Sequence, residues 1–254
     1  MIFNLFKPKS KLGIDIGTSS IKIVELGKRG GRFVLENYGF FELKGTSGDG
    51  TEQSILKLPD EEITWGIKEV IKNSKMRSRD AVASIPSFST FATVIELPYL
   101  SEDDIAKAIP FEARKYIPIP LNEVVLDWSI IGIVGQAPTG KAPAGARGTN
   151  VEVFLAAVPK DETARYQRIF KSVGLNLVAL ELENSALIRG LLGNDPAPTA
   201  LINIGGRSTS IVIVDKGYER VSHNYEIGGF EITKSIARTL NVSLEKAEDL
   251  KRRL

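Results

Sequence analysis

The most regular pattern in the chain lies between residues 12 and 25, where hydrophobic side chains occupy nearly every second position. The alternation stops once, at Gly17-Thr-Ser-Ser20, and then resumes through Ile21 and Ile23. A period of two is typical of a β-strand with one buried face. A short turn rich in glycine and hydroxyl groups between two such runs therefore predicts a β-hairpin.

A second stretch repeats this pattern. Residues 201–214 read Leu-Ile-Asn-Ile-Gly-Gly-Arg-Ser-Thr-Ser-Ile-Val-Ile-Val, so a small polar turn again joins two alternating runs. Asn203 takes the position of Asp15, and Gly205 takes that of Gly17. Two similar hairpins far apart in one chain indicate a duplicated domain that holds a ligand between its halves.

The rest of the chain predicts alternating strands and helices, and hence a mixed α/β fold. Helical spacing recurs in residues 60–75, 102–116, 161–173, 185–192, 228–240 and from 244 onward. Ser101 is the expected N-cap of the second of these helices. Pro110 falls inside the same helix and is expected to kink or divide it, because proline lacks the N–H that the helix needs.

Composition narrows the function classes. The 254 residues are 43% hydrophobic and 25% charged, which suits one large or two modest domains with a sizeable core. A net charge of +2 gives no case for a nucleic-acid partner. The absence of cysteine excludes disulfides and thiolate metal sites, and the single histidine, His223, argues against a histidine-based metal site or triad. No run approaches the roughly 18 apolar residues of a membrane span, so no transmembrane segment is predicted.

The first hairpin carries side chains suited to a phosphate. Glycine, serine and threonine in the turn leave backbone N–H groups free to surround an anion, and Lys22 adds a positive charge. Asp15 suits Mg²⁺, which takes few carboxylates and keeps several waters. An ordinary surface hairpin with an unrelated acid explains the first copy alone equally well, and the second copy favours the ligand site.

The start of the chain permits two interpretations. Residues 1–11 contain Phe3, Leu5 and Phe6 together with three lysines, but no apolar run long enough for a signal peptide follows. We interpret them as a mobile leader ahead of the first strand. The alternative is that they touch a membrane surface or a neighbouring subunit, although so short an amphipathic piece binds membranes weakly.

Several motifs resemble known families. Asp15-Ile-Gly-Thr-Ser-Ser-Ile-Lys22 and Asn203-Ile-Gly-Gly-Arg-Ser-Thr209 resemble the two phosphate motifs of the superfamily of ATPases that includes actin, heat-shock chaperones and sugar kinases. Further stretches resemble the PilM family of type IV pilus assembly proteins, relatives of the cell-division protein FtsA. They are Phe3-Asn-Leu-Phe-Lys7, Glu96-Leu-Pro-Tyr-Leu-Ser101 through Tyr116-Ile-Pro-Ile-Pro120 to Val124-Val-Leu-Asp127, and Gly228-Gly-Phe-Glu-Ile-Thr233.

The resemblance implies an actin-like, ribonuclease H-like duplicated fold with an inserted small αβ subdomain. In this interpretation residues 12–86 and 159–197 form the first lobe, and residues 87–158 form the inserted subdomain, which binds a partner. Residues 198–254 begin a second lobe that is incomplete, because the sequence ends before the glycine pair that receives adenosine in the superfamily. The sequence is therefore expected to be truncated at its C-terminus.

The resemblance also implies ATP and Mg²⁺ between the two lobes. Carried over by position, Asp15 would hold the water shell of Mg²⁺. The residues expected to surround the phosphates are Gly17, Thr18, Ser19 and Lys22 from the first turn, and Gly205, Gly206 and Thr209 from the second. No catalytic residue is assigned. Asn203 stands where the superfamily commonly has Asp, so hydrolysis is expected to be slow or absent, at most that of a weak ATPase; loss of one such group typically costs about 10²–10³-fold.

The family further implies a cytoplasmic protein that is held at the inner membrane by a partner, the N-terminal tail of the pilus protein PilN, bound as an extended peptide. Our first hypothesis is thus a nucleotide-binding scaffold of pilus assembly, with self-association as a further expectation. The alternatives are an active ATPase or phosphotransferase of the same superfamily, and a filament-forming division factor similar to FtsA.

Overall fold

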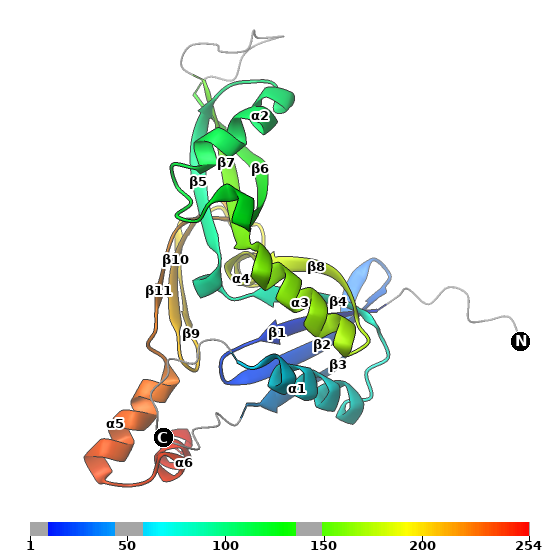
Figure 1. Cartoon of the computed structure of the whole chain (residues 1–254), viewed down its shortest axis with the longest axis vertical. Coiled ribbons are helices and arrows are strands. Elements are labelled where there is room, and N and C mark those ends of the chain that lie inside the picture. The colour runs from blue at the N-terminus through cyan, green and yellow to red at the C-terminus, as the bar shows by residue number, and fades with distance from the viewer. Residues whose placement is uncertain (1–9, 44–57, 136–148, 254) are drawn as a thin grey trace, which may run out of the picture.

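Three β-sheets and the helices packed on them make up the part of the chain that the structure describes (Figure 1). The computed structural model describes residues 10–43, 58–135 and 149–253. Residues 1–9, which hold most of the expected leader and its family-like Phe3–Lys7 stretch, lie outside the described residues.

The first sheet has five strands in the order β3-β2-β1-β4-β8. β1, β2 and β3 form an antiparallel meander, while β4 pairs parallel with β1 and β8 pairs parallel with β4. The bounds are β1 Lys11–Ile16, β2 Ser20–Arg29, β3 Arg32–Glu42, β4 Asp80–Ile85 and β8 Asn176–Leu182.

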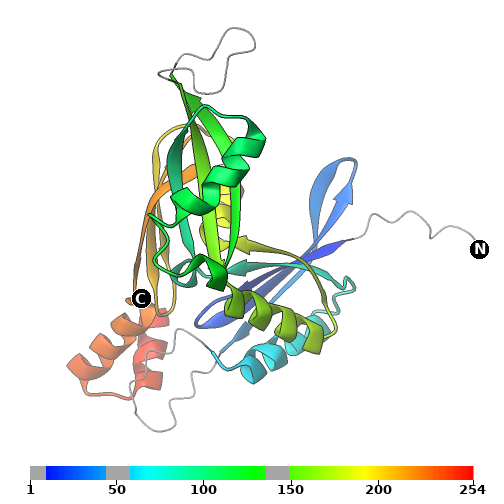
Figure 2. The ribbon, with the colours of Figure 1, turned by 45° about the horizontal axis from the view of Figure 1, so that its top comes forward.

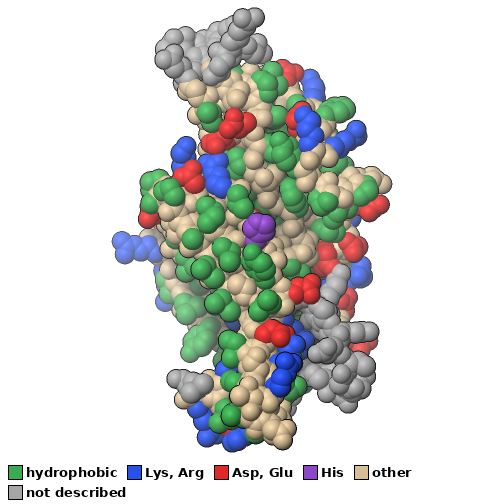
Figure 3. All heavy atoms as spheres, turned by 90° about the vertical axis from the view of Figure 1, so that its left-hand side faces the viewer, with side chains coloured by type: hydrophobic (Ala, Val, Ile, Leu, Met, Phe, Trp, Pro, Cys, Tyr) green, Lys and Arg blue, Asp and Glu red, His purple; other side chains and the backbone are tan. Residues whose placement is uncertain are grey.

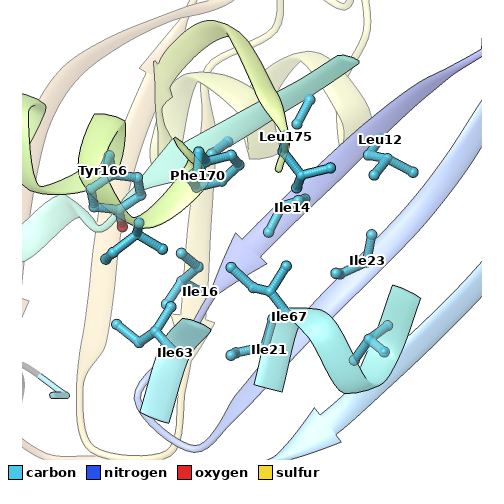
Figure 4. Packing of buried hydrophobic residues seen from close by; sticks show 14 of the residues in the cluster. Leu12, Ile14, Ile16, Ile21, Ile23, Ile63, Ile67, Tyr166, Phe170 and Leu175 are labelled. Carbon is cyan, nitrogen blue, oxygen red and sulfur yellow. The ribbon is translucent and has the colours of Figure 1, made fainter. Parts of the chain in front are cut away.

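Helices α1 (Asp60–Asn73) and α3 (Lys160–Ser172) cover one face of this sheet and form the main core (Figure 4). The alternating residues Leu12, Ile14 and Ile16 of β1 point into it, as the period of two predicts. Full burial of such aliphatic side chains stabilises a fold by about 1.5–3 kcal/mol each, so this core fixes the strand that leads into the first turn.

The second sheet, in the order β5-β7-β6, stands above the first one (Figures 1 and 2). Its bounds are β5 Phe91–Pro98, β6 Val124–Val134 and β7 Asn150–Pro159, with helix α2 (Glu102–Ala113) packed on it and short 3₁₀ turns at Ser87–Ser89 and Leu121–Glu123.

Two expectations about α2 have different outcomes. Ser101 caps the helix as expected, since its side chain accepts a hydrogen bond from the Asp104 N–H at 3.2 Å. Of the two effects expected of Pro110, a kink or a division, the division does not occur, because α2 continues through Pro110 to Ala113. Ile105 and Ile109 are buried before Pro110 and Ala113 after it, so packing on the sheet holds both parts of the helix in one piece.

The third sheet has the order β11-β10-β9 and is antiparallel throughout. Its bounds are β9 Thr199–Ile204, β10 Thr209–Asp215 and β11 Tyr218–Tyr225, followed by α5 Gly229–Leu240 and α6 Leu244–Arg252. Helix α4 (Glu183–Leu191), which follows β8, buries Ile188 against Leu201, Val212 and Val214 on one face. The opposite face is exposed and rich in hydrophobic side chains around His223 (Figure 3).

The predicted repeat is present in the strand registers. Asp15 pairs with Lys22 across β1–β2, and Asn203 pairs with Ser210 across β9–β10. A bulge interrupts the ladder at equivalent points, after Glu25 in β2 and after Ile213 in β10. The two meanders are therefore copies of one unit.

Candidate functional site

Both hairpin turns close in the same way. In the first turn the Gly17 N–H donates to the Ser20 carbonyl at 3.0 Å, and in the second the Gly205 N–H donates to the Ser208 carbonyl at 2.8 Å. A Cβ at either glycine would lie 3.0 Å from that same carbonyl oxygen. Glycine therefore suits both positions, because a side chain would crowd that oxygen, and small turns of this kind can bring backbone N–H groups close to an anion.

The two turns lie against each other, although 189 residues separate Thr18 and Arg207 in the chain. The Arg207 N–H donates to the Thr18 hydroxyl at 3.2 Å. A Cβ at Gly206 would come within 2.6 Å of the Ser19 side chain, so this second glycine permits the contact. The structure thus brings together five of the residues expected to surround phosphates: Gly17, Thr18, Ser19, Gly205 and Gly206.

Asp15 and Lys22 form an ion pair beside the first turn. The Lys22 Nζ lies 3.0 Å from Asp15 Oδ2, and the Ser84 hydroxyl donates to Asp15 Oδ1 at 3.4 Å. Both charged side chains are exposed, so the pair itself contributes little stability. Among the described residues no group of three or more acidic, histidine or cysteine side chains is placed to hold a metal. A single carboxylate nevertheless suits Mg²⁺, which is commonly bound by one or two carboxylates together with substrate phosphates.

Thr209 is positioned differently from the other candidate residues. Its hydroxyl donates to the Ile227 carbonyl at 2.6 Å, so it ties the start of β10 to the segment that leads into α5. The first N–H groups of α5, those of Gly229 and Phe230, donate to the carbonyls of Gly205 and Gly206 at 2.9 and 2.8 Å. The second turn is therefore held from behind by the N-terminus of α5.

An ionic cluster between α5 and α6 supports this arrangement. The Lys251 Nζ donates to the Gly229 carbonyl at 3.0 Å and lies 2.7 Å from the Glu248 carboxylate. Burial acts to raise the pKa of Glu248, but hydrogen bonds from Lys251, Thr233 and Arg252 outweigh it and lower that pKa to about 2. Glu248 is consequently ionised at neutral pH and fixes the lysine that holds Gly229.

Two charged residues near the turns were not predicted from the sequence to belong to the site. Glu183 accepts hydrogen bonds from Asn203 Nδ2 at 2.9 Å and from the Ser87 N–H at 3.1 Å, so its carboxylate bridges the two halves. It was overlooked because the helix was expected to begin at Ser185, whereas α4 begins at Glu183. Arg207, in the second turn, stacks its guanidinium 4.6 Å from the Phe230 ring centroid. An acid at the first position of a helix after a strand, and an arginine inside a glycine turn, were the available signals.

The chain is similar in sequence to several known proteins. The family model described as type IV pilus assembly protein PilM matches residues 13–254. Among curated proteins the chain is similar to the cell division protein FtsA of Enterococcus faecalis, with 23% identity over 94% of this chain and 57% of that protein. It is also similar to FtsA of Bacillus subtilis, with 22% identity over 96% of this chain and 57% of that protein. The chain thus spans somewhat more than half the length of these relatives.

Solved structures agree on the fold. A chain of a PilM–PilN type IV pilus biogenesis complex superimposes with a TM-score of 0.74 and 25% identity, covering 95% of this chain and 69% of that one. The ethanolamine utilization protein EutJ of Carboxydothermus hydrogenoformans gives a TM-score of 0.55 at 15% identity, over 98% and 63% of the two chains. The expected mixed α/β fold of the actin-like class is confirmed.

Proposed function

The chain belongs to the family of the type IV pilus assembly protein PilM, and on that premise we propose that it is a nucleotide-binding scaffold of pilus assembly. In this proposal ATP with Mg²⁺ binds where the two hairpin turns meet. The scaffold recruits the N-terminal tail of PilN, which keeps it at the cytoplasmic side of the inner membrane. No described helix is long and apolar enough to cross that membrane.

The contact between the two matching turns carries the nucleotide part of the proposal. Each turn is closed by one N–H to carbonyl bond from a glycine at which a Cβ would lie 3.0 Å from that carbonyl oxygen, and the turns touch through Thr18 and Arg207. Two small turns rich in glycine and hydroxyl groups that meet at one place suit a polyanion such as a triphosphate, because little side chain stands between it and the backbone. Lys22 supplies the positive charge, and Asp15 is the carboxylate that holds the Mg²⁺ water shell.

Binding of a fluorescent ATP analogue to the purified chain, with and without Mg²⁺, tests this part. Lys22→Ala is expected to weaken affinity by roughly 10- to 150-fold, because a hydrogen bond to a charged group contributes about 1.5–3 kcal/mol. Asp15→Asn is expected to remove the dependence on Mg²⁺. Lys107→Ala is the matched control, because Lys107 lies in a similarly exposed ion pair, 3.7 Å from Asp104, on α2. Equal affinity of all these variants and the wild type would contradict the proposed site.

The inserted subdomain supports the partner part of the proposal. In the order β5-β7-β6, β6 is an edge strand, and its residues Val125 and Ile130 are exposed. An extended peptide gains affinity by adding a strand to such an edge, through main-chain hydrogen bonds. The free edge of β6 is therefore our candidate for the surface that takes the PilN tail.

The chain has no cysteine, so a single introduced cysteine can report on this surface. A fluorophore at Ser129→Cys on β6 is expected to respond to a synthetic peptide of the PilN N-terminus and not to the same residues in scrambled order. A fluorophore at Ser235→Cys on α5 is the control and is expected to stay silent. If the peptide binds but changes the fluorescence of neither label, the docking surface lies elsewhere on the chain. No binding at all refutes the partner, whatever the result for ATP.

Glu183 favours slow ATP hydrolysis as a second candidate function. Its carboxylate lies hydrogen-bonded to Asn203 beside the second turn, where it offers an acceptor for an attacking water. Release of phosphate from ATP by the purified chain, lost in Glu183→Gln with nucleotide affinity retained, would support this activity. Equal release by the variant would assign the turnover to a contaminant or to another residue.

A further inference from the structure

The β2–β3 hairpin is longer than its counterpart in the second half of the chain. Beyond the equivalent bulges, β10 and β11 form two residue pairs before turning at Lys216-Gly217, whereas β2 and β3 form four before turning at Gly30-Gly31. The turns are of one kind, since φ is 53° and 80° in the former and 55° and 80° in the latter. The duplicated fold is complete without the two added pairs.

The two added pairs consist mainly of cationic residues. They are Lys28 with Phe33 and Arg29 with Arg32, which gives three cations and one aromatic ring. We name these four residues with Gly30 and Gly31 the hairpin tip. Glu36 of β3 pairs with Arg29 at 3.3 Å.

The hairpin tip projects away from the rest of the molecule. Strand β1 begins at Lys11, opposite Leu26, so the two added pairs extend past the end of β1, and Figures 1 and 2 show the hairpin beyond the sheet. A Cβ at Gly30 or Gly31 would meet no atom of the described residues within 4 Å. The side chain of Phe33 is 76% exposed, with Lys28 Nζ 5.8 Å from its ring centroid.

Phe33 projects beside Lys28, with Arg29 and Arg32 in the same hairpin tip. This combination fits a surface whose outer layer is negatively charged and whose interior is apolar. We propose that the hairpin tip makes a direct contact with an anionic lipid bilayer, with Phe33 inserted among the head groups and Lys28, Arg29 and Arg32 facing lipid phosphates. Charge complementarity selects this occupant over a neutral protein surface, and each cation near an anionic bilayer adds roughly a fivefold factor to the partition coefficient. This contact is independent of PilN and orients the first sheet relative to the membrane.

Co-sedimentation of the full chain with vesicles tests the contact. Binding is expected to vesicles of phosphatidylglycerol mixed with phosphatidylcholine, to weaken with added salt, and to be far weaker on phosphatidylcholine alone. Phe33→Ser is expected to lower the partition coefficient by about tenfold, and Lys28→Ser with Arg32→Ser by about 25-fold. Phe111→Ser is the matched control: Phe111 is 66% exposed with the Arg114 guanidinium 5.6 Å from its ring centroid, but lies on α2.

Insertion is measured separately with an environment-sensitive fluorophore on a single cysteine. A label at Phe33→Cys is expected to shift to the blue on anionic vesicles, and one at Phe111→Cys is not. Equal binding to neutral vesicles, unchanged partitioning of Phe33→Ser, or equal shifts at both labels would overturn the proposal. So would a vesicle-independent change of oligomeric state in Phe33→Ser, since that result would assign the hairpin tip to a second copy of the chain.

Discussion

Gly228 offers the most direct test of how the second turn is held. Its backbone is extended, with φ of −153°, so any residue can adopt its conformation. A Cβ there would lie 2.6 Å from the Gly205 oxygen, 2.7 Å from the Gly206 carbonyl carbon and 2.8 Å from the Arg207 nitrogen. These are backbone atoms of the second turn, which cannot rotate away as the end of a side chain can. Gly228→Ala must therefore push α5 and the turn apart.

The free-energy cost of Gly228→Ala has two contributions. Overpacking in a tight site costs about 1–3 kcal/mol. Separation also strains the hydrogen bonds from the Gly229 and Phe230 N–H groups to the turn, each with a net value of about 0.5–1.5 kcal/mol. The opening free energy of this contact is thus expected to fall by about 2–4 kcal/mol, which corresponds to exchange of these two amides that is roughly 30- to 1,000-fold faster.

Hydrogen exchange of the Gly229 and Phe230 amides in the Gly228→Ala variant is the assay, since local opening can be read there without global unfolding. Gly190→Ala is the control: a Cβ at Gly190, in α4, would meet nothing within 4 Å, and alanine there is expected to stabilise the helix by about 1 kcal/mol. If the Gly229 and Phe230 amides exchange in the Gly228→Ala variant at the wild-type rate, the contact between α5 and the second turn does not hold that turn in place.

Three further substitutions test the core and the ionic contacts. Ile67→Ala, in the fully buried face of α1, is expected to lower the free energy of unfolding by about 2–5 kcal/mol in urea titrations. Glu25→Ala leaves the N–H groups of Arg77 and Ser78 without the carboxylate that they reach at 3.2 and 2.7 Å, and an expected loss of about 2–4 kcal/mol would be measured in the same way. Because the folded-state pKa of Glu248 is lowered to about 2 from 4.5, the stability it contributes is present above about pH 4.5 and is lost as the pH falls toward 2. Unfolding measured across that range is expected to depend less on pH in Glu248→Gln than in the wild type.

The sequence predicted those parts of the fold in which local periodicity and turn chemistry act together. Both hairpins were identified from alternation around a glycine turn, and Ser101 caps α2 as expected, accepting from the Asp104 N–H at 3.2 Å. The bulges after Glu25 and Ile213 were not predicted, because a bulge is a property of how two strands pair, and the sequence of one strand does not show it.

Burial could not be predicted from the same alternation. Ile14 and Ile16 in β1 are 3% and 7% exposed, whereas Ile202 and Ile204, at the equivalent positions of β9, are 60% and 69% exposed. Both strands carry an Ile-x-Ile motif before the glycine of the turn, but α1 and α3 pack over the first pair, whereas in β9 the buried residue is Leu201, on the opposite face. Which face of a strand is covered depends on elements distant in the sequence, and periodicity carries no information about them.

The pair formed by Asn203 and Glu183 shows the same limit at the candidate site. From the sequence alone, asparagine at position 203 counted as the loss of a carboxylate. In the structure the Asn203 amide donates to Glu183 at 2.9 Å, so a carboxylate contributed by α4 lies beside the second turn. An aspartate at position 203 would place two carboxylates at hydrogen-bond distance, where like charges repel and neither has an N–H to donate. Asn203 is therefore matched to Glu183: the amide N–H orients this carboxylate, so an acid lies beside the second turn although position 203 does not supply it.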